Sequence, residues 1–154
     1  MSDPSFNIRD ASLADLDRIA EIENDSFPDP YPRGLLKGLF YLPGGYVVAV
    51  SEEKVIGYAI GIMRWRSIGH VVSVAVDPRA RRRGVGKALM RGLMERLISQ
   101  GAKKIRLEVR ESNAFAKGMY CKLGFFEKGK IEKYYADGES AVCMYLSVTP
   151  DPQK

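Results

Sequence analysis

Cysteine and histidine are scarce in this sequence, and long apolar runs are missing. The 154 residues include only two cysteines, Cys121 and Cys143, and one histidine, His70. Two thiols are too few for a disulfide framework, and these residues fit no zinc-ligand spacing. No stretch approaches the roughly 18 apolar residues of a membrane span, and the N-terminus lacks the apolar core of a signal peptide. These absences predict a soluble protein of the reducing cytoplasm, with no membrane anchor and no metal site.

The composition is that of an ordinary globular domain. Hydrophobic residues make up 45% and charged residues 28% of the chain, which is long enough to bury a core without cross-links. We expect one domain over residues 1–148 and a frayed tail over 149–154. The net charge is +5, and five cations lie close together: Arg79, Arg81, Arg82, Arg83 and Lys87. Such a run is typical of a solvated turn, of a nucleic-acid patch or of a phosphate-binding loop.

Hydrophobic periodicity predicts seven strands and three helices. Strands are expected over 6–9, 46–50, 55–63, 70–76 and 104–109, from 125 onward and over 140–146, and helices after Ser12, over 85–99 and after Ser112. Gly57 and Gly61 lie inside one predicted strand, which indicates a bulge or close backbone approach. This order of elements predicts an α/β domain with a mixed sheet.

The first predicted helix has a clear apolar stripe and begins at a capping box formed by Ser12 and Asp15. The stripe comprises Leu13, Leu16, Ile19, Ala20 and Ile22, and the residues expected to face water are Asp15, Asp17, Arg18 and Glu21. Three prolines then interrupt the segment FPDPYPR over 27–33, so this segment is predicted to be a semi-rigid loop with exposed aromatic side chains.

The stretch GHVVSVAVDPRARRRGVGK, over 69–87, combines a strand, a glycine loop and a helix. Backbone N–H groups in such a loop, together with the helix N-terminus, bind phosphate. The stretch lacks the first glycine and the hydroxyl residue of a P-loop, and Leu89 replaces the third glycine of a dinucleotide fingerprint. It does match the pattern [RQ]-x-x-G-x-[GA] at Arg81, Gly84 and Gly86.

Five segments in order resemble the Gcn5-related N-acetyltransferases, in particular the Ard1 and RimI type that acetylates protein N-termini. These segments are HVVSVAV, RRRGVG, LEVRESN, MYCKLGFF and YYADGESAVCMY. The resemblance implies a mixed, mostly antiparallel sheet, splayed between its two middle strands and flanked by about four helices. It also implies acetyl-CoA as cosubstrate on one side of the split. A protein N-terminus, of a ribosomal protein or a nascent chain, is expected on the other.

The same resemblance assigns residues to the cofactor. Those implied for acetyl-CoA are Val74, Ala75 and Val76 on the strand, Arg81, Arg82, Arg83, Gly84, Val85, Gly86 and Lys87 in the pyrophosphate loop, and Asn113, Gly118, Met119 and Tyr120 along the pantetheine arm. On residue type alone, Asn113 is equally well explained as a first-turn residue of a helix that Ser112 caps.

Three residues are implied for catalysis: Glu108 as general base through water, His70 as its helper and Tyr120 as the acid that protonates the thiolate. Each also has an ordinary structural explanation. Glu108 could belong to an exposed strand face with Arg106 and Arg110, His70 could be a polar strand end, and Tyr120 could be a core residue. A phenol with a pKa of about 10 is protonated at neutral pH, as a general acid must be.

The resemblance places the peptide between the loop over 27–33 and the turn over 133–138, beside Phe27, Tyr31, Tyr134 and Tyr135. An α-amine with a pKa of about 7.8 is roughly one tenth neutral at pH 7, against less than about one thousandth for lysine. Little base strength is therefore needed. A small-amine or lysine acetyltransferase on the same fold remains an alternative, as does a basic nucleic-acid or ribosome-binding module. The acetyltransferase reading predicts no specific nucleic-acid partner.

Overall fold

Seven strands form one sheet in the computed structural model, which describes residues 5–65 and 67–148. Their order across the sheet is β1-β2-β3-β4-β5-β7-β6. The strands are β1 (Asn7–Asp10), β2 (Gly44–Ser51), β3 (Lys54–Arg64), β4 (Ile68–Val76), β5 (Lys104–Arg110), β6 (Phe126–Ile131) and β7 (Ala141–Ser147). The sequence pattern predicted all seven. The tail expected over 149–154 lies outside the described residues.

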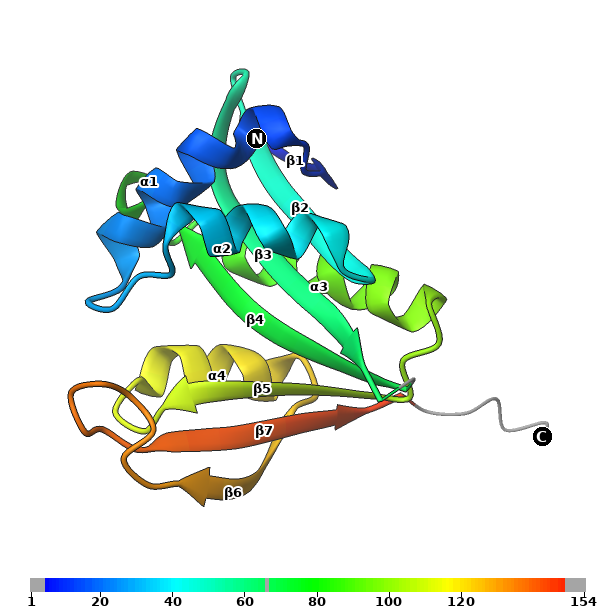
Figure 1. Ribbon diagram of the computed structural model, residues 1–154, viewed down its shortest axis with the longest axis vertical. Helices are drawn as coiled ribbons and strands as arrows, with labels where there is room; N and C mark the ends of the chain where they lie inside the picture. The colour runs from blue at the N-terminus through cyan, green and yellow to red at the C-terminus, as the bar shows by residue number, and fades with distance from the viewer. Residues whose placement is uncertain (1–4, 66, 149–154) are drawn as a thin grey trace.

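The sheet opens between β4 and β5, its only parallel neighbours among the described strands. The two strands pair only at Ile68 with Lys104, Gly69 with Ile105 and His70 with Arg106. Beyond His70 they diverge, so that the sheet forms a V in Figure 1. The splayed mixed sheet that the family resemblance implied is therefore confirmed.

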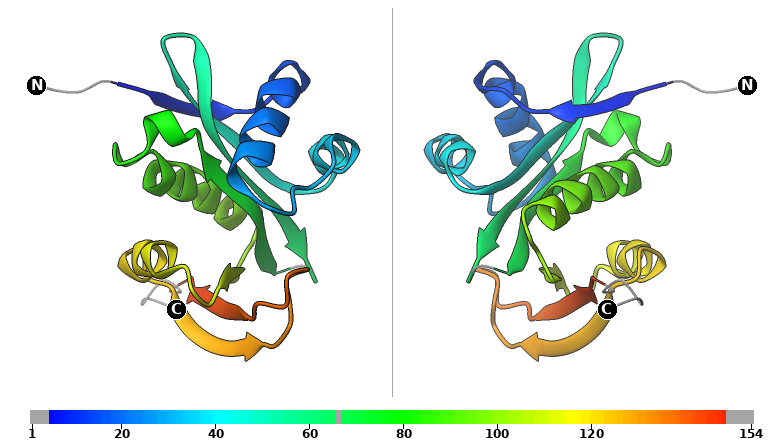
Figure 2. Two further views of the ribbon diagram at one scale, coloured as in Figure 1. Left: turned by 90° about the vertical axis from the view of Figure 1, so that its left-hand side faces the viewer. Right: turned by 90° about the vertical axis from the view of Figure 1, so that its right-hand side faces the viewer.

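Helices cover both faces of the sheet (Figure 2). Helices α1 (Leu16–Ser26) and α2 (Arg33–Gly38) lie on one face, and α3 (Val85–Ser99) and α4 (Ala114–Lys122) lie on the other. The pattern did not predict α2, which is a six-residue helix, but it completes the four helices that the resemblance implied. Within the described ranges, no helix is long and apolar enough to cross a membrane.

Each face has its own apolar core. Helix α3 packs against β1, β2, β3 and β4, with Leu89, Leu93 and Leu97 in the core on that face. Helix α1 packs against β3 and β4, with Leu16, Ile19 and Ile22 in the core on the other face. A Cβ atom at Gly57 would lie 2.9 Å from Leu89 Cδ1 and 3.0 Å from the Ala75 carbonyl oxygen. The predicted close approach at Gly57 is thus confirmed, since α3 could not pack so closely on a larger residue.

Two local predictions need correction. Asp15 is buried and Arg18 is largely buried, although both were expected to face water. The Asp15 carboxylate accepts the backbone N–H of Ser12 at 2.8 Å, as the capping box predicted, but it also binds Arg9. Asn113, rather than Ser112, caps α4, because its side-chain oxygen accepts the Ala116 N–H at 3.0 Å.

Candidate active site

The loop between β4 and α3 presents backbone donors and positive charge to the opening. Arg82 and Gly84 adopt left-handed backbone conformations, with φ of 67° and 78°, and α3 begins directly after them at Val85. The first N–H groups of a helix have no partner within the helix, and they carry its partial positive charge. A Cβ atom at Gly84 would meet no atom within 4 Å. The loop therefore offers an open cradle for an anion.

The base of the opening holds a buried carboxylate with two partners. Glu108 Oε1 lies 2.8 Å from His70 Nε2, and its Oε2 accepts a 2.7 Å hydrogen bond from Arg106 Nε. The side chain of Glu108 is only 8% exposed. Alternation along β5 places Arg106, Glu108 and Arg110 on one face, as the sequence predicted. Because Glu108 is buried against His70 of β4, this face is not an ordinary solvated surface.

The environment of Glu108 keeps the carboxylate ionised. Burial alone would raise its pKa, but the hydrogen bonds and electrostatic effects of His70 and Arg106 outweigh burial and lower the pKa below its usual value. A carboxylate that is ionised at neutral pH, with one oxygen directed to a histidine, can accept a proton through that histidine or through water. The structure thus brings together the two residues predicted as base and helper.

Helix α4 and the end of β4 line the other predicted part of the cofactor path. Val74 and Val76 pack on the α3 and α4 side with Met119 and Tyr120, whereas Ala75 packs on the α1 side. A Cβ atom at Gly86 would lie 3.5 Å from Met119 Sδ, so α4 comes close to the start of α3. A Cβ atom at Gly118 would meet nothing within 4 Å. Burial raises the pKa of Tyr120 to about 12, which keeps its hydroxyl protonated at neutral pH.

Aromatic residues gather on the opposite side of the split. Burial raises the pKa of Tyr31 and of Tyr134, and the negative charge of Glu108 contributes to both shifts. Both phenols therefore lie within electrostatic reach of that carboxylate. The ring of Tyr134 packs edge to face with that of Tyr135, at 5.0 Å between centroids. Phe27 packs in part against the core beneath α1.

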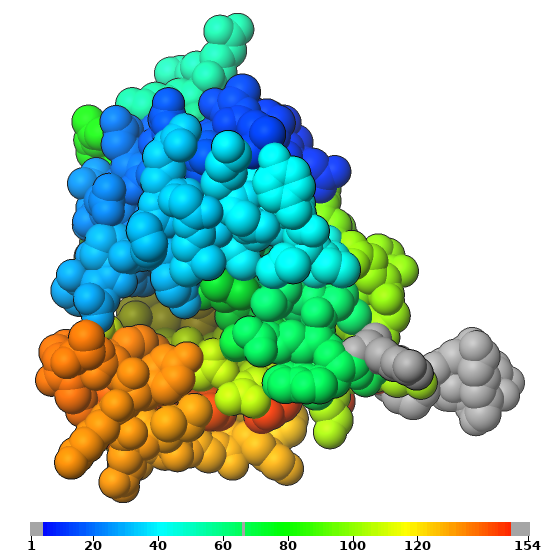
Figure 3. Space-filling view, viewed as in Figure 1, coloured from blue at the N-terminus to red at the C-terminus, as the bar shows by residue number. Residues whose placement is uncertain are grey.

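The two loops that carry these aromatics line a pocket. It has a volume of about 290 Å³ and is lined by Pro28, Asp29, Arg110, Ala136 and Asp137. Figure 3 shows that the blue loop after α1 and the orange loop before β7 approach each other at the left of the molecule. The Arg110 guanidinium lies 4.1 Å from the centre of the Tyr135 ring and pairs with Asp137 and Glu139. The loop before β7 is therefore held in place at its base.

Sequence reasoning missed Glu23, which is 2% exposed in α1. Its carboxylate accepts hydrogen bonds from the Tyr58 hydroxyl, from Ser73 Oγ at 2.9 Å and from the Tyr31 backbone N–H at 2.9 Å. Glu23 thereby ties the loop after α1 to β3 and β4. One signal was available: Glu23 stands four residues after Ile19, on the apolar stripe of its helix.

Comparisons with known proteins agree with this geometry. Over residues 16–125 the chain matches the model of the acetyltransferase (GNAT) family. It is 36% identical over 158 aligned positions to an N-alpha-acetyltransferase of Sulfurisphaera tokodaii. The alignment covers 94% of this chain and 93% of that protein.

Two solved structures share the fold over nearly the full length. Ard1 from Thermoplasma volcanium superposes with a TM-score of 0.89 and 30% identity, covering 94% of this chain and 99% of that one. The ribosomal-protein alanine N-acetyltransferase of Escherichia coli superposes with a TM-score of 0.87 and 28% identity, covering 97% of each chain. From the matched family model, the curated relative and the splayed sheet, we conclude that this chain belongs to the acetyltransferase (GNAT) family.

Proposed function

We propose that this protein transfers the acetyl group of acetyl-CoA to the free α-amino group of protein N-termini. The observation that carries the proposal is the ionised Glu108 carboxylate, paired with His70 at the base of the split. The phosphate-binding type of loop lies at the end of β4. The charge of Glu108 contributes to the raised pKa of Tyr31 and of Tyr134. One site thus combines an anion cradle, a base and an aromatic wall.

Acetyltransferases of this family take the acetyl group from acetyl-CoA, and the residues present fit that molecule. The open space above Gly84 and the left-handed Arg82 suit a pyrophosphate that approaches the backbone closely. Arg81, Arg83 and Lys87 add positive charge. In our proposal Val74 to Val76, Asn113 and Gly118 to Tyr120 hold the rest of the molecule, which supplies the acetyl group as a reactive thioester.

In the proposed reaction, Glu108 and His70 receive the proton of the attacking amine, directly or through water. Tyr120 holds a proton at neutral pH and gives it to the departing thiolate. No covalent enzyme intermediate is needed, because a neutral α-amine is itself a good nucleophile. Phe27, Tyr31, Tyr134 and Tyr135 orient the first residues of the peptide, so that positioning supplies much of the rate enhancement.

The proposed acceptor is the N-terminus of a ribosomal protein or of nascent chains more generally. Support comes from the names of relatives, which include N-alpha-acetyltransferases and ribosomal-protein alanine N-acetyltransferases. We also propose a cytoplasmic location. Cys121 and Cys143 are free thiols in the described structure, which suits a reducing compartment.

The proposal is tested with three acceptors: a short peptide with a free N-terminus, the same peptide with a blocked N-terminus and a lysine, and a small diamine. We expect acetylation of the free N-terminus to be about 100-fold faster than that of the lysine, in line with their neutral fractions. Initial rates of CoA release measure the difference. Faster reaction with lysine or with the diamine would replace our acceptor by one of the alternatives on the same fold.

The pH dependence of kcat/KM should reflect the ionisation of the acceptor amine rather than that of the Glu108 carboxylate. Because the pKa of Glu108 is lowered, its carboxylate is already ionised throughout the range above pH 6. We therefore expect kcat/KM to rise with pH until about 7.8, the pKa of an α-amine. Rate profiles with two peptides whose α-amines differ in pKa provide the check. If the inflection of the profile stays at the same pH with the peptide of lower amine pKa, the inflection belongs to a group of the enzyme instead.

A further inference from the structure

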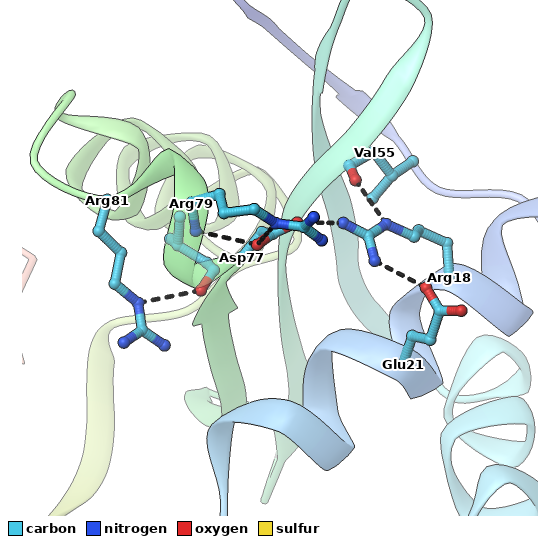
Figure 4. Close-up of polar contacts among 7 residues, drawn as sticks. Arg18, Glu21, Val55, Asp77, Arg79 and Arg81 are labelled. Carbon is cyan, nitrogen blue, oxygen red and sulfur yellow. Dashed lines mark hydrogen bonds and ion pairs between the residues drawn. The ribbon is translucent and has the colours of Figure 1, made fainter.

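Arg18 of α1 forms three hydrogen bonds that are unrelated to the apolar core of its helix. Its Nη2 donates to Asp77 Oδ2, its Nε to the Val55 carbonyl oxygen at 3.0 Å, and its Nη1 to Glu21 Oε1 at 2.7 Å (Figure 4). The side chains of Arg18 and Asp77 are only 18% and 7% exposed. The guanidinium therefore joins helix α1 to β3 and to the first residue after β4.

Asp77 is the first residue of the segment that joins β4 to α3 and contains the proposed cofactor loop, and several groups hold it in place. Its backbone N–H donates to the Ile56 carbonyl oxygen at 2.8 Å, which extends the pairing with β3. Its Oδ1 accepts the backbone N–H of Arg79 at 3.0 Å. This hydrogen bond lowers the pKa of Asp77 most, and Arg18 also lowers it, against the opposing effect of burial. The carboxylate is thus an ionised anchor for the first turn of the loop.

The rest of the loop depends on that first turn. Arg81 Nε donates to the Val76 carbonyl oxygen at 3.1 Å, and it is followed by the left-handed residues Arg82 and Gly84. A backbone with two such residues receives an anion only if its N–H groups point in fixed directions. A displacement at Asp77 would turn the N–H groups that follow.

We propose that Arg18 is a positioning residue for cofactor binding, which acts through Asp77 on the backbone of the loop over 79–84. The inference rests on the proposed function, because it assigns that loop to the pyrophosphate of CoA. Arg18 lies on α1, outside the loop, and its effect passes through the carboxylate that it holds. Its removal should therefore weaken CoA binding and leave the chemical step unchanged.

The test is the affinity for CoA, measured by calorimetry without any peptide. Arg18→Met keeps the aliphatic stem and removes all three donors. We expect its Kd for CoA to rise about tenfold, equivalent to about 1.4 kcal/mol. The KM for acetyl-CoA should rise with it, while kcat and the KM for peptide stay within about twofold. Arg18→Lys should restore part of the affinity, since an ammonium retains the charge but cannot form the same fork.

Arg96→Met is the matched control. Arg96 of α3 also bridges two elements, with a 2.6 Å contact to Asp10, but it lies toward the other end of the helix from the loop. We expect this variant to bind CoA like the unchanged protein. Melting curves show whether each variant is folded. If Arg18→Met does not fold, Arg18→Lys decides the question, with a rise of about threefold expected and no rise contradicting the proposal.

A double-variant cycle with Asp77→Asn tests the route of the effect. If Arg18 acts through Asp77, adding Arg18→Met to Asp77→Asn should change the Kd by less than about twofold. An unchanged Kd in folded Arg18→Met, or an equal effect in both backgrounds, would overturn the inference. The proposed acceptor and the proposed role of Arg18 are tested independently. A protein that binds CoA but acetylates no N-terminus would refute the proposed acceptor. The comparison of Kd values would still decide the role of Arg18.

Discussion

Glu108→Gln should lower kcat by about 100-fold, within the range measured for the loss of a general base. His70 and Arg106 now contact the two carboxylate oxygens at 2.8 Å and 2.7 Å. The amide oxygen can still accept the hydrogen bond from Arg106, and the amide NH2 can donate to His70 Nε2, but the amide cannot take up a proton. The KM for acetyl-CoA should change by less than about twofold, because the phosphate cradle belongs to another element. Steady-state kinetics with a peptide substrate measures both quantities.

Glu111→Gln serves as the control for this prediction. Glu111 follows the same strand, and its exposed carboxylate pairs only with Lys130 at 3.0 Å among the described contacts. Its variant should retain normal turnover. Weakened acetyl-CoA binding with normal turnover in Glu108→Gln would contradict the role of Glu108 as base and would make it a structural partner of Arg106.

Gly84→Val should abolish detectable CoA binding. Gly84 has a φ of 78° and open space around the position of a Cβ atom. A branched side chain would fill the space that we assign to the pyrophosphate, and it would also strain a left-handed backbone. Calorimetric titration with CoA measures the loss.

Gly101→Val separates these two effects. Gly101 also has a left-handed φ, of 104°, and no atom near a Cβ position, but it follows the end of α3. A valine there carries similar backbone strain without approaching the loop, so CoA affinity should be normal. Tight CoA binding by a folded Gly84→Val variant would remove the phosphate-loop assignment.

Local sequence patterns were enough to predict the strands and the long helix α3. Alternation in β4 and β5 and the leucine spacing of α3 are properties of neighbouring residues, so they are visible in the sequence. The sequence pattern did not predict helix α2. Its sequence RGLLKG has only six residues, two of them glycines, and the prolines before it indicated a loop. The splay between β4 and β5 came from the family resemblance, since no local pattern indicates where two strands part.

The polar links of the site were harder to predict for a different reason. Arg18 and Asp77 are 59 residues apart, and Glu23 reaches Ser73 across 50 residues. A charged residue on a helix is usually solvated, so only the folded structure reveals these partners. The pair His70 and Glu108 was predicted through the resemblance, and its hydrogen bond now gives that prediction a geometric basis.

The proposed preference for α-amines is tested with one peptide that carries both a free α-amine and an internal lysine. The peptide is incubated with acetyl-CoA and the protein, and fragmentation in a mass spectrometer locates the added acetyl group. We predict that the acetyl group is found on the N-terminal nitrogen alone. Acetylation of the lysine side chain, with the N-terminus left free, would contradict the central claim that this site acts on α-amines.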